Sequence, residues 1–416
     1  MPQTPARQLG ELGAALLDAG VSVTDVATSL DRAAARNGVA RLDFAVLPEL
    51  IMITEPYSGS STVVQSRKQE LTFRQASWVN RLARRVEAGD VPLGEVVERV
   101  ASIREVVRTR VGLKWTLGTA LLSLGLALLF RTPWWAVLLS FLVGGLVGAI
   151  SKLLGRIGGA AAIMPFVVAF VSTAAVGAVA ELLSTGPVPL FAVCAPIAIL
   201  VPGALITNAL LELTASDIVT GASRLVYGLI VLGFMAAGIT AGGSLTGLHV
   251  DPGSVVLVGD AANATALGPG WQELPPLWFS WVGVVLLALG IGLAFGSGRA
   301  LNAVNVVVML GAYAMITLLT GPLGNLLAVG VTAASLFIAA RLIERLTLAV
   351  PATVSFQPAF LLLVPGTIGL VALYAFDVES LITSLLTFAS LCIGTKVGDV
   401  LSEIVVQRRK ETDLSS

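Results

Sequence analysis

The chain has 416 residues, of which 56% are hydrophobic and only 12% are charged, about half the charged fraction of a typical soluble domain. Its 26 basic and 26 acidic residues cancel, so no excess of positive charge indicates a nucleic-acid partner. Two cysteines and a single histidine, His249, exclude a disulfide scaffold and most histidine-dependent metal or triad chemistry. This composition predicts an α-helical polytopic membrane protein.

Charged residues concentrate at the start of the chain. Residues 1–114 hold 15 of the 26 basic and 13 of the 26 acidic residues, whereas long apolar runs dominate the remaining sequence. We therefore expect a small cytoplasmic α+β domain over residues 1–114, followed by a membrane-embedded part. The first apolar stretch is short and carries Glu11 and Asp18, so we expect no secretory signal peptide.

Local patterns predict the elements of this first domain. Apolar residues at helical spacing predict helices over residues 6–19 and 23–38, and Ser22 or Thr24 is the expected N-cap of the second helix. Short runs rich in β-branched residues predict strands, and two later stretches have helical periodicity. The strands are expected in RLDFAVLP, ELIMITEP and STVVQSR, and the helices in LTFRQASWVNRLARRVEAGD and PLGEVVERVASIREVVRTR.

Apolar runs of spanning length follow one another beyond residue 114, and a membrane helix needs about 20 apolar residues. The runs predict ten transmembrane helices, at about residues 115–131, 134–150, 160–182, 187–207, 222–243, 277–296, 301–319, 323–343, 355–376 and 380–405. We expect a first five-helix repeat over residues 115–243 and an extracytoplasmic loop over 244–276. A second five-helix repeat and a cytoplasmic tail are expected over residues 277–416.

The distribution of basic residues between successive loops predicts the orientation. With the first domain in the cytoplasm, the cytoplasmic loops and tail hold Lys152, Arg156, Arg224, Arg299, Arg341, Arg345, Arg408, Arg409 and Lys410. The opposite loops hold Arg131, and the long loop 244–276 contains no lysine or arginine. We therefore expect a multi-pass plasma-membrane protein whose N- and C-termini are both cytoplasmic.

Two apolar segments resemble each other at a spacing of 163 residues. ILVPGALITNALLEL, from Ile199, and LLVPGTIGLVALYAF, from Leu362, each contain a Pro-Gly pair in the fourth span of a set of five. An odd number of spans inverts the second copy, as in many secondary transporters, so we expect two inverted repeats. A Pro-Gly pair breaks a helix and exposes polar backbone, which predicts a substrate site. The alternative is a packing kink.

At these residues the chain resembles the bacterial threonine/serine exporter family. In VPGALITNALLELTASDIVTGASRL the family pattern is matched by Pro202, Gly203, Thr207, Asn208, Asp217, Gly221 and Arg224, with Leu211-Glu212 in place of the usual Arg-Asp. In PATVSFQPAFLLLVPGTIGL it is matched by Pro351, Pro358, Pro365 and Gly366. The resemblance implies export of threonine and serine from bacteria, driven by the proton motive force. Split members are linked to dicarboxylate export, so a dicarboxylate such as succinate is the alternative substrate.

The candidate site residues form three sets. Groups at the Pro-Gly pairs and one membrane lysine are the substrate-binding candidates: Pro202, Gly203, Thr207, Asn208, Pro365, Gly366, Thr367 and Lys396. Carboxylates are the proton-coupling candidates, namely Asp399, Glu212 and Asp217. The gating candidates are Arg224 and Glu181. The alternatives are a surface salt bridge in the Glu212–Arg224 segment, an interfacial charge at Glu181, and a Lys396 side chain that reaches the membrane interface.

The sequence contains no Walker loop, GxSxG, HExxH or CxxC motif. We therefore expect no enzyme activity, no cofactor and no metal. The expected partners are a small amino-acid or organic-acid substrate, protons and the lipid bilayer, and a homo-oligomer is left open. A membrane-anchored sensor or scaffold acting through the first domain and a channel are the competing functions. An anchor needs no broken helices, and no ring of repeated polar residues indicates a channel.

Overall fold

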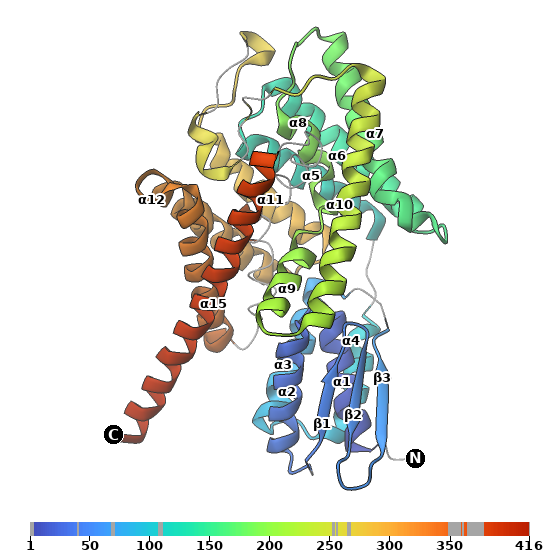
Figure 1. Ribbon diagram of the computed structural model, residues 1–416, viewed down its shortest axis with the longest axis vertical. Coiled ribbons are helices and arrows are strands. Elements are labelled where there is room, and N and C mark those ends of the chain that lie inside the picture. Colours follow the sequence, from blue (N-terminus) through green and yellow to red (C-terminus); the bar gives the residue numbers. More distant parts are fainter. Residues whose placement is uncertain are drawn as a thin grey trace.

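The chain is organised in two parts that lie one above the other. The computed structural model describes residues 4–39, 41–67, 71–106, 111–251, 254, 257–263, 268–347, 359, 362–363 and 378–415. Residues 5–104 form an N-terminal helix–sheet region, called the N-terminal region below, and residues 111–415 supply a bundle of apolar helices. The marked N- and C-terminal ends lie at the same end of the molecule (Figure 1).

The N-terminal region is built on a three-stranded antiparallel sheet in the order β1-β2-β3. Its strands are β1 (Asp43–Val46), β2 (Leu50–Thr54) and β3 (Ser61–Gln65), and its helices are α1 (Pro5–Asp18), α2 (Val23–Arg36), α3 (Phe73–Ala88) and α4 (Val96–Arg104), with a 3-10 turn η1 (Leu93–Glu95) before α4. The three predicted strands and the first three predicted helices are found here, whereas the helix predicted over residues 92–110 is α4 over Val96–Arg104, and residues 107–110 lie outside the described residues. Ile51 and Ile53 alternate inward along β2 and are fully buried together with Leu9, Leu12 and Leu30.

The bundle consists mainly of helices long and apolar enough to cross a membrane. Six helices meet that criterion among the described residues: α5 (Val111–Leu129), α6 (Trp134–Leu154), α7 (Ala160–Leu182), α10 (Ile218–Thr246), α12 (Arg299–Thr347) and α15 (Val378–Ser415). The chain is therefore a multi-pass membrane protein. Two shorter apolar segments accompany them. They are α11 (Phe279–Ala294), and α8 (Leu190–Ile197) with the 3-10 turn η2 (Ala198–Leu200); α9 (Gly203–Thr214) follows the turn.

The ten predicted spans correspond to these helices in different ways. The seventh and eighth both lie in α12, which is interrupted at Gly324, where φ is 75° and ψ is 161°. The sixth is α11, whose 16 residues extend about 24 Å, somewhat less than a hydrocarbon core of about 30 Å. The ninth, 355–376, lies almost wholly outside the described residues. The count of ten spans therefore stays a prediction.

Helices α5 and α11 pack against each other in an antiparallel sense, with glycines at the points of contact. A Cβ at Gly118 would lie 2.8 Å from the carbonyl oxygen of Gly290, and a Cβ at Gly125 would lie 2.6 Å from that of Gly283. The reverse substitutions would clash equally, at 2.8 Å and 2.6 Å. Small residues allow such close backbone approach in lipid, where no hydrophobic effect drives helices together. The contact is therefore symmetric: Gly118 and Gly125 of α5 meet Gly290 and Gly283 of α11 in equivalent ways.

Helices α7 and α10 pack in a parallel sense. A Cβ at Gly238 would clash with the carbonyl oxygen of Phe166, and a Cβ at Gly242 would lie 2.8 Å from that of Phe170. Residue numbers rise together along both helices, which fixes the relative direction. The third and fifth predicted spans are thus neighbours that run in the same direction.

The second part of α12 and α15 repeat this parallel arrangement. A Cβ at Gly394 would clash with the carbonyl oxygen of Gly330, and a Cβ at Gly398 would lie 2.7 Å from that of Ala334. These helices correspond to the eighth and tenth predicted spans, which hold the third and fifth places in the second set of five. The third and fifth spans of each set of five therefore pack against each other in a parallel sense.

Candidate functional site

The apolar chain is broken at Pro202–Gly203, as the sequence predicts. Helix α8 ends at Ile197, η2 covers Ala198–Leu200, and Val201 adopts an extended conformation with φ −62° and ψ 122° before α9 begins at Gly203. Proline has no backbone N–H and favours an extended residue before it, which accounts for the break.

The segment before the break is short and enclosed. All eight residues of α8 are buried, and a helix of that length extends only about 12 Å. It contacts α5, α6 and α7 (Figure 1). Irregular backbone at membrane depth is tolerated where protein surrounds it. Among the other substrate-binding candidates, Gly203 is buried and Pro202 and Asn208 are partly buried. The side chain of Thr207 and the whole of Pro365, Gly366 and Thr367 lie outside what the structure describes.

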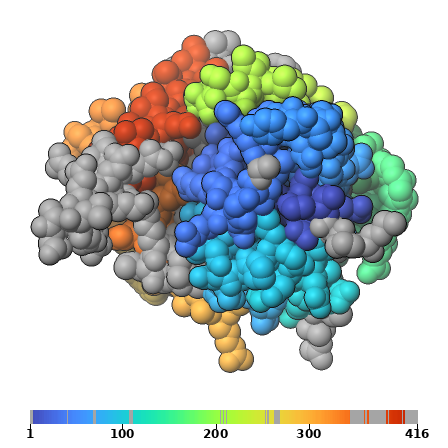
Figure 2. Space-filling model, turned by 90° about the horizontal axis from the view of Figure 1, so that it is seen from below, coloured from blue at the N-terminus to red at the C-terminus, as the bar shows by residue number. Residues whose placement is uncertain are grey.

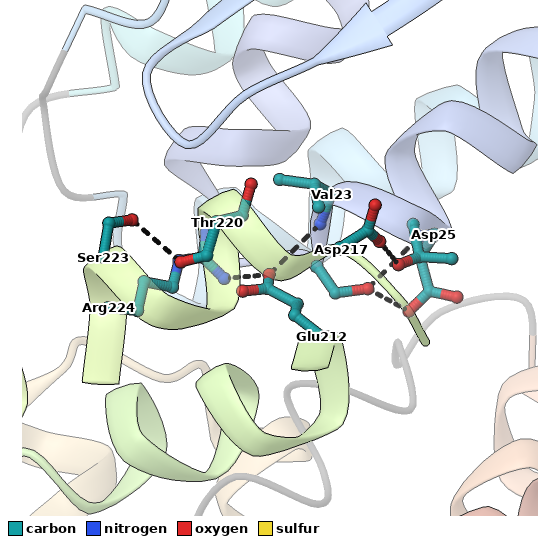
Figure 3. Close-up of polar contacts among 9 residues, drawn as sticks. Val23, Asp25, Glu212, Asp217, Thr220, Ser223 and Arg224 are labelled. Atoms are coloured by element: carbon teal, nitrogen blue, oxygen red, sulfur yellow. Dashed lines mark hydrogen bonds and ion pairs between the residues drawn. The ribbon is translucent and has the colours of Figure 1, made fainter. Parts of the chain in front are cut away.

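A buried ion pair lies where α9 turns into α10. The Glu212 side chain is 1% exposed and pairs through Oε1 with Nη1 of Arg224, which is 15% exposed (Figure 3). Its second oxygen, Oε2, accepts no hydrogen bond from the described residues. The backbone N–H of Asp217 donates to the Glu212 carbonyl oxygen at 2.9 Å, which closes the turn. The structure therefore brings the candidates Glu212, Asp217 and Arg224 together, and Glu212 is not at the surface.

The environment of Glu212 favours its protonated form. Burial raises the pKa of the Glu212 carboxyl above its ordinary value because the ionised form loses its hydration. The positive charge of Arg224 and the backbone N–H of Val23 act in the opposite direction, and the nearby carboxylate of Asp217 adds to the rise. The net direction is upward, which is typical of groups that exchange protons during function.

The N-terminus of α2 completes this cluster from the N-terminal region (Figure 3). Ser22 is the N-cap, and its hydroxyl accepts a hydrogen bond from the Asp25 backbone N–H at 3.2 Å. The Val23 backbone N–H donates to Glu212 Oε1 at 3.5 Å, and the Thr24 hydroxyl donates to Asp217 Oδ2. A helix N-terminus carries unpaired N–H groups and partial positive charge, so it favours adjacent carboxylates.

Sequence reasoning predicted the cap but missed the contact. Of the two N-cap candidates, Ser22 is the one the structure confirms. Val23 and Glu212 are separated by 189 positions, and no local pattern links them.

The two gating candidates lie near opposite ends of the packed pair α7 and α10. Arg224 is near the first turn of α10, whereas Glu181 is exposed near the end of α7. Gly177, one turn before Glu181, lies directly against Thr246, the last residue of α10. A rise of 1.5 Å per residue separates Arg224 from Thr246 by about 33 Å. Glu181 therefore does not belong to the Glu212 cluster.

Lys396 lies within an uninterrupted helix. Helix α15 continues from Val378 to Ser415, and its apolar window, Leu385–Ser402, contains both Lys396 and Asp399. Lys396 is partly buried, and the Asp399 side chain lies outside the described part of the chain. Helix α15 also contacts α9, the helix that follows the Pro202–Gly203 break. The predicted lysine and the first break are thus on neighbouring helices.

A second polar contact occurs at the other end of the bundle, where η3 (Val258–Asn263) meets the interruption of α12. The Asn325 side-chain amide donates to Asp260 Oδ2 at 2.7 Å, and the Thr320 hydroxyl donates to Asn325 Oδ1 at 3.3 Å. Arg131 anchors the same loop by donating to the Ala261 carbonyl oxygen at 3.4 Å. Asp260 and Asn325 are 65 positions apart, and no local pattern links them.

One buried amide in the bundle has no described partner. Asn305 in α12 is fully buried, and neither of its amide atoms forms a hydrogen bond within the part of the chain that the structure describes. An unsatisfied buried amide is uncommon and is often a point of contact for a polar ligand or water. No group of three or more His, Cys, Asp or Glu side chains suitable for a metal occurs among the described residues.

Comparison with known proteins identifies a family to which the chain is similar. The model of ThrE, the threonine/serine exporter family, matches residues 7–246, which is more than half of the chain. The matched segment includes the N-terminal region, the Pro202–Gly203 break and the Glu212 cluster. Neither a curated protein nor a solved structure matches the chain.

Proposed function

Because the chain belongs to the threonine/serine exporter family, we propose that it is a secondary active exporter of threonine and serine in the bacterial plasma membrane, driven by proton exchange. The observation that carries the proposal is the enclosed helix break at Pro202–Gly203. An anchor or scaffold needs no such break, whereas a transporter uses the exposed backbone to bind its substrate.

The substrate binds at the break between α8 and α9. The first N–H groups of α9 and its positive dipole end favour the carboxylate of an amino acid. The carbonyl groups at the end of η2 accept hydrogen bonds from its ammonium group. Asn208 and Thr207, within the first turns of α9, offer polar groups to the hydroxyl of threonine or serine. Pro365, Gly366 and Thr367, which lie outside the described residues, are the substrate-binding candidates of the second half, and Lys396 on the neighbouring α15 meets the substrate carboxylate.

Carboxylates carry the proton that drives export. Glu212 is the first candidate because it is buried beside Arg224 and its pKa is raised. Asp217 and Asp399 are the others. In an exchange cycle Glu212 takes up a proton from outside and releases it to the cytoplasm. An amino acid then enters the site from the cytoplasm. Arg224 gates this exchange by pairing with ionised Glu212, and Glu181 is an entry charge at the opposite face.

Two inverted repeats explain the packing of the bundle. The antiparallel contact of α5 and α11 joins the first spans of the two halves in one self-matching register. The parallel contacts of α7 with α10 and of α12 with α15 join the third and fifth spans of each half. A twofold axis in the membrane plane, passing between α5 and α11, accounts for both observations.

Both termini of the chain are cytoplasmic in this proposal. The N-terminal region and the C-terminal end lie at one end of the molecule (Figure 1), and the basic residues of the loops are concentrated on that side. The positive-inside rule assigns that side to the cytoplasm.

The test is efflux from proteoliposomes preloaded with labelled threonine, serine or succinate. An inward-directed proton gradient should accelerate efflux of threonine and serine and leave succinate unaffected. Preferential efflux of succinate would instead identify a dicarboxylate exporter. Absence of efflux for all three substrates, with correctly inserted protein, would favour a sensor or scaffold.

A further inference from the structure

The N-terminal region covers the middle of one end of the bundle. Figure 2 shows this end with the N-terminal region spread across its centre, bordered by the α9–α10 segment and by α15. The N-terminal region therefore lies over the end of the bundle at which the α9–α10 turn is found.

The tip of α2 contacts both halves of the bundle. Val23 and Thr24 bind Glu212 and Asp217 at the α9–α10 turn, which belongs to the first half. Asp25, the next residue of α2, forms an ion pair with Arg341 of α12 at 3.8 Å, in the second half. Consecutive residues at one helix N-terminus thus hold together two parts of the bundle that are distant in sequence.

Two of these contacts, Thr24–Asp217 and Asp25–Arg341, are of a kind that opens readily, whereas the Val23–Glu212 hydrogen bond is buried. The Asp25 side chain is 50% exposed and that of Arg341 is 24% exposed, and exposed ion pairs contribute little net stability. The hydroxyl–carboxylate bond of Thr24 is also exposed to solvent and is replaceable by water.

The opposite attachment of the N-terminal region is apolar and tighter. The Phe73 backbone N–H, at the start of α3, donates to the Phe295 carbonyl oxygen at 3.0 Å. The two rings stack with their centroids 5.0 Å apart, and Trp115 packs edge-on against Phe295 at 5.8 Å. The region is thus fixed beside α11, and the polar contacts of the α2 tip hold it near α9 and α12.

We propose that the tip of α2, residues Ser22–Asp25, is a cytoplasmic latch of the exporter. The latch closes the route to the Pro202–Gly203 break when it binds the α9–α10 turn and Arg341. It opens when the N-terminal region pivots about the Phe73–Phe295 attachment. The proposal rests on the proposed export function and adds the element that controls access to its site.

A reversible cross-link tests the latch without altering Glu212 or Asp217. Thr24→Cys and Ile218→Cys are introduced in a chain in which Cys194 and Cys392 are replaced by alanine; Ile218 is exposed and directly follows Asp217. A short bis-methanethiosulfonate reagent joins the two cysteines. We expect export to fall at least tenfold on linking and to return on reduction. Unchanged export by the linked protein would overturn the latch.

A matched control separates the latch from general damage. Thr54→Cys and Ser61→Cys join directly opposed residues of β2 and β3, whose hydroxyls are 3.3 Å apart, within the N-terminal region. Linking this pair should leave export within twofold of the reduced protein. An equal loss of export in both linked proteins would also overturn the latch, because any rigid link in the region would then block transport.

Spin labels at the same positions give a readout that does not depend on the substrate. Labels at 24 and 218 in the purified full-length protein should report two distances by dipolar broadening of continuous-wave electron paramagnetic resonance spectra, whereas labels at 54 and 61 should report one. A single distance for both pairs would contradict a moving latch even if export is active. Two distances at the latch without efflux of any amino acid would retain the latch and reject the exporter proposal.

Discussion

Glu212 is a carboxylate held out of water beside Arg224, and Asp217, Asp25 and Arg341 are the other charged groups around the α2 tip. Burial raises the pKa of the Glu212 carboxyl above its ordinary value of 4.5. The closed arrangement therefore keeps its proton at pH values where an exposed glutamate has lost it. The resulting stabilisation is fully present below the ordinary pKa and is lost as pH rises through the raised pKa.

This linkage predicts how pH affects the closed state. Between the ordinary and raised pKa of Glu212, increasing pH should decrease the stability of the wild-type protein relative to Glu212→Gln, which cannot titrate. Each unit of pKa elevation corresponds to about 1.4 kcal/mol. The measurement is the thermal unfolding midpoint of both proteins in detergent as a function of pH. Parallel pH profiles for the two proteins would show that Glu212 does not take up a proton in the closed state.

Among the helices, the proposed substrate site depends most on the break at Pro202–Gly203. Gly203 is buried at the first residue of α9, so a branched side chain there would occupy the space beside the broken backbone. We expect Gly203→Leu to insert normally and to lose export by at least tenfold.

Gly233→Leu is the matched control for this change. Gly233 lies on an exposed face of α10, and a Cβ there would meet nothing within 4 Å. Its export should remain close to wild type, as measured by threonine efflux per inserted protein. Wild-type efflux by Gly203→Leu would indicate that the Pro-Gly pair is only a kink.

Local chemistry made some elements predictable and left others hidden. A Pro-Gly pair in an apolar run favours a break in the helix, so the break at Pro202–Gly203 could be predicted from the sequence. The N-cap at Ser22 could be predicted as well, because Ser22 followed by Asp25 is a local N-cap pattern. The bonds from Val23 to Glu212 and from Asn325 to Asp260 join residues that are distant in the chain. The burial of Glu212 depends on tertiary packing by the N-terminal region, and a charged residue after an apolar run is equally typical of a surface loop.

At the scale of the whole molecule, the proposed orientation can be tested by labelling. Single cysteines at positions 85, 260 and 410 probe the N-terminal region, the loop 244–276 and the C-terminal tail. A membrane-impermeant maleimide added to intact cells should label position 260 and leave 85 and 410 unlabelled until the membrane is opened. External labelling at 410 would contradict the arrangement with both termini in the cytoplasm.

The two polar contacts at opposite ends of the bundle are expected to be coupled. The latch holds the end that carries the N-terminal region, and the Asp260–Asn325 hydrogen bond holds η3 against the interruption of α12 at the other end. A transporter that exposes its site alternately must open one end while the other is closed, so weakening one contact should favour closure of the other.

Asp260→Ala tests this coupling. The lost hydrogen bond involves a carboxylate, and bonds to charged groups contribute about 1.5–3 kcal/mol, which corresponds to a shift in the opening equilibrium of about tenfold or more. We expect a cysteine at Thr320 to react faster with an external impermeant reagent in this variant. The spin-label pair at 24 and 218 should shift toward its shorter, closed distance.

Glu273→Ala, which removes an exposed carboxylate from the same loop, should change neither signal. If Asp260→Ala accelerates labelling at 320 but leaves the latch distances unchanged, the two ends open independently, and the Asp260–Asn325 contact does not take part in an alternating cycle.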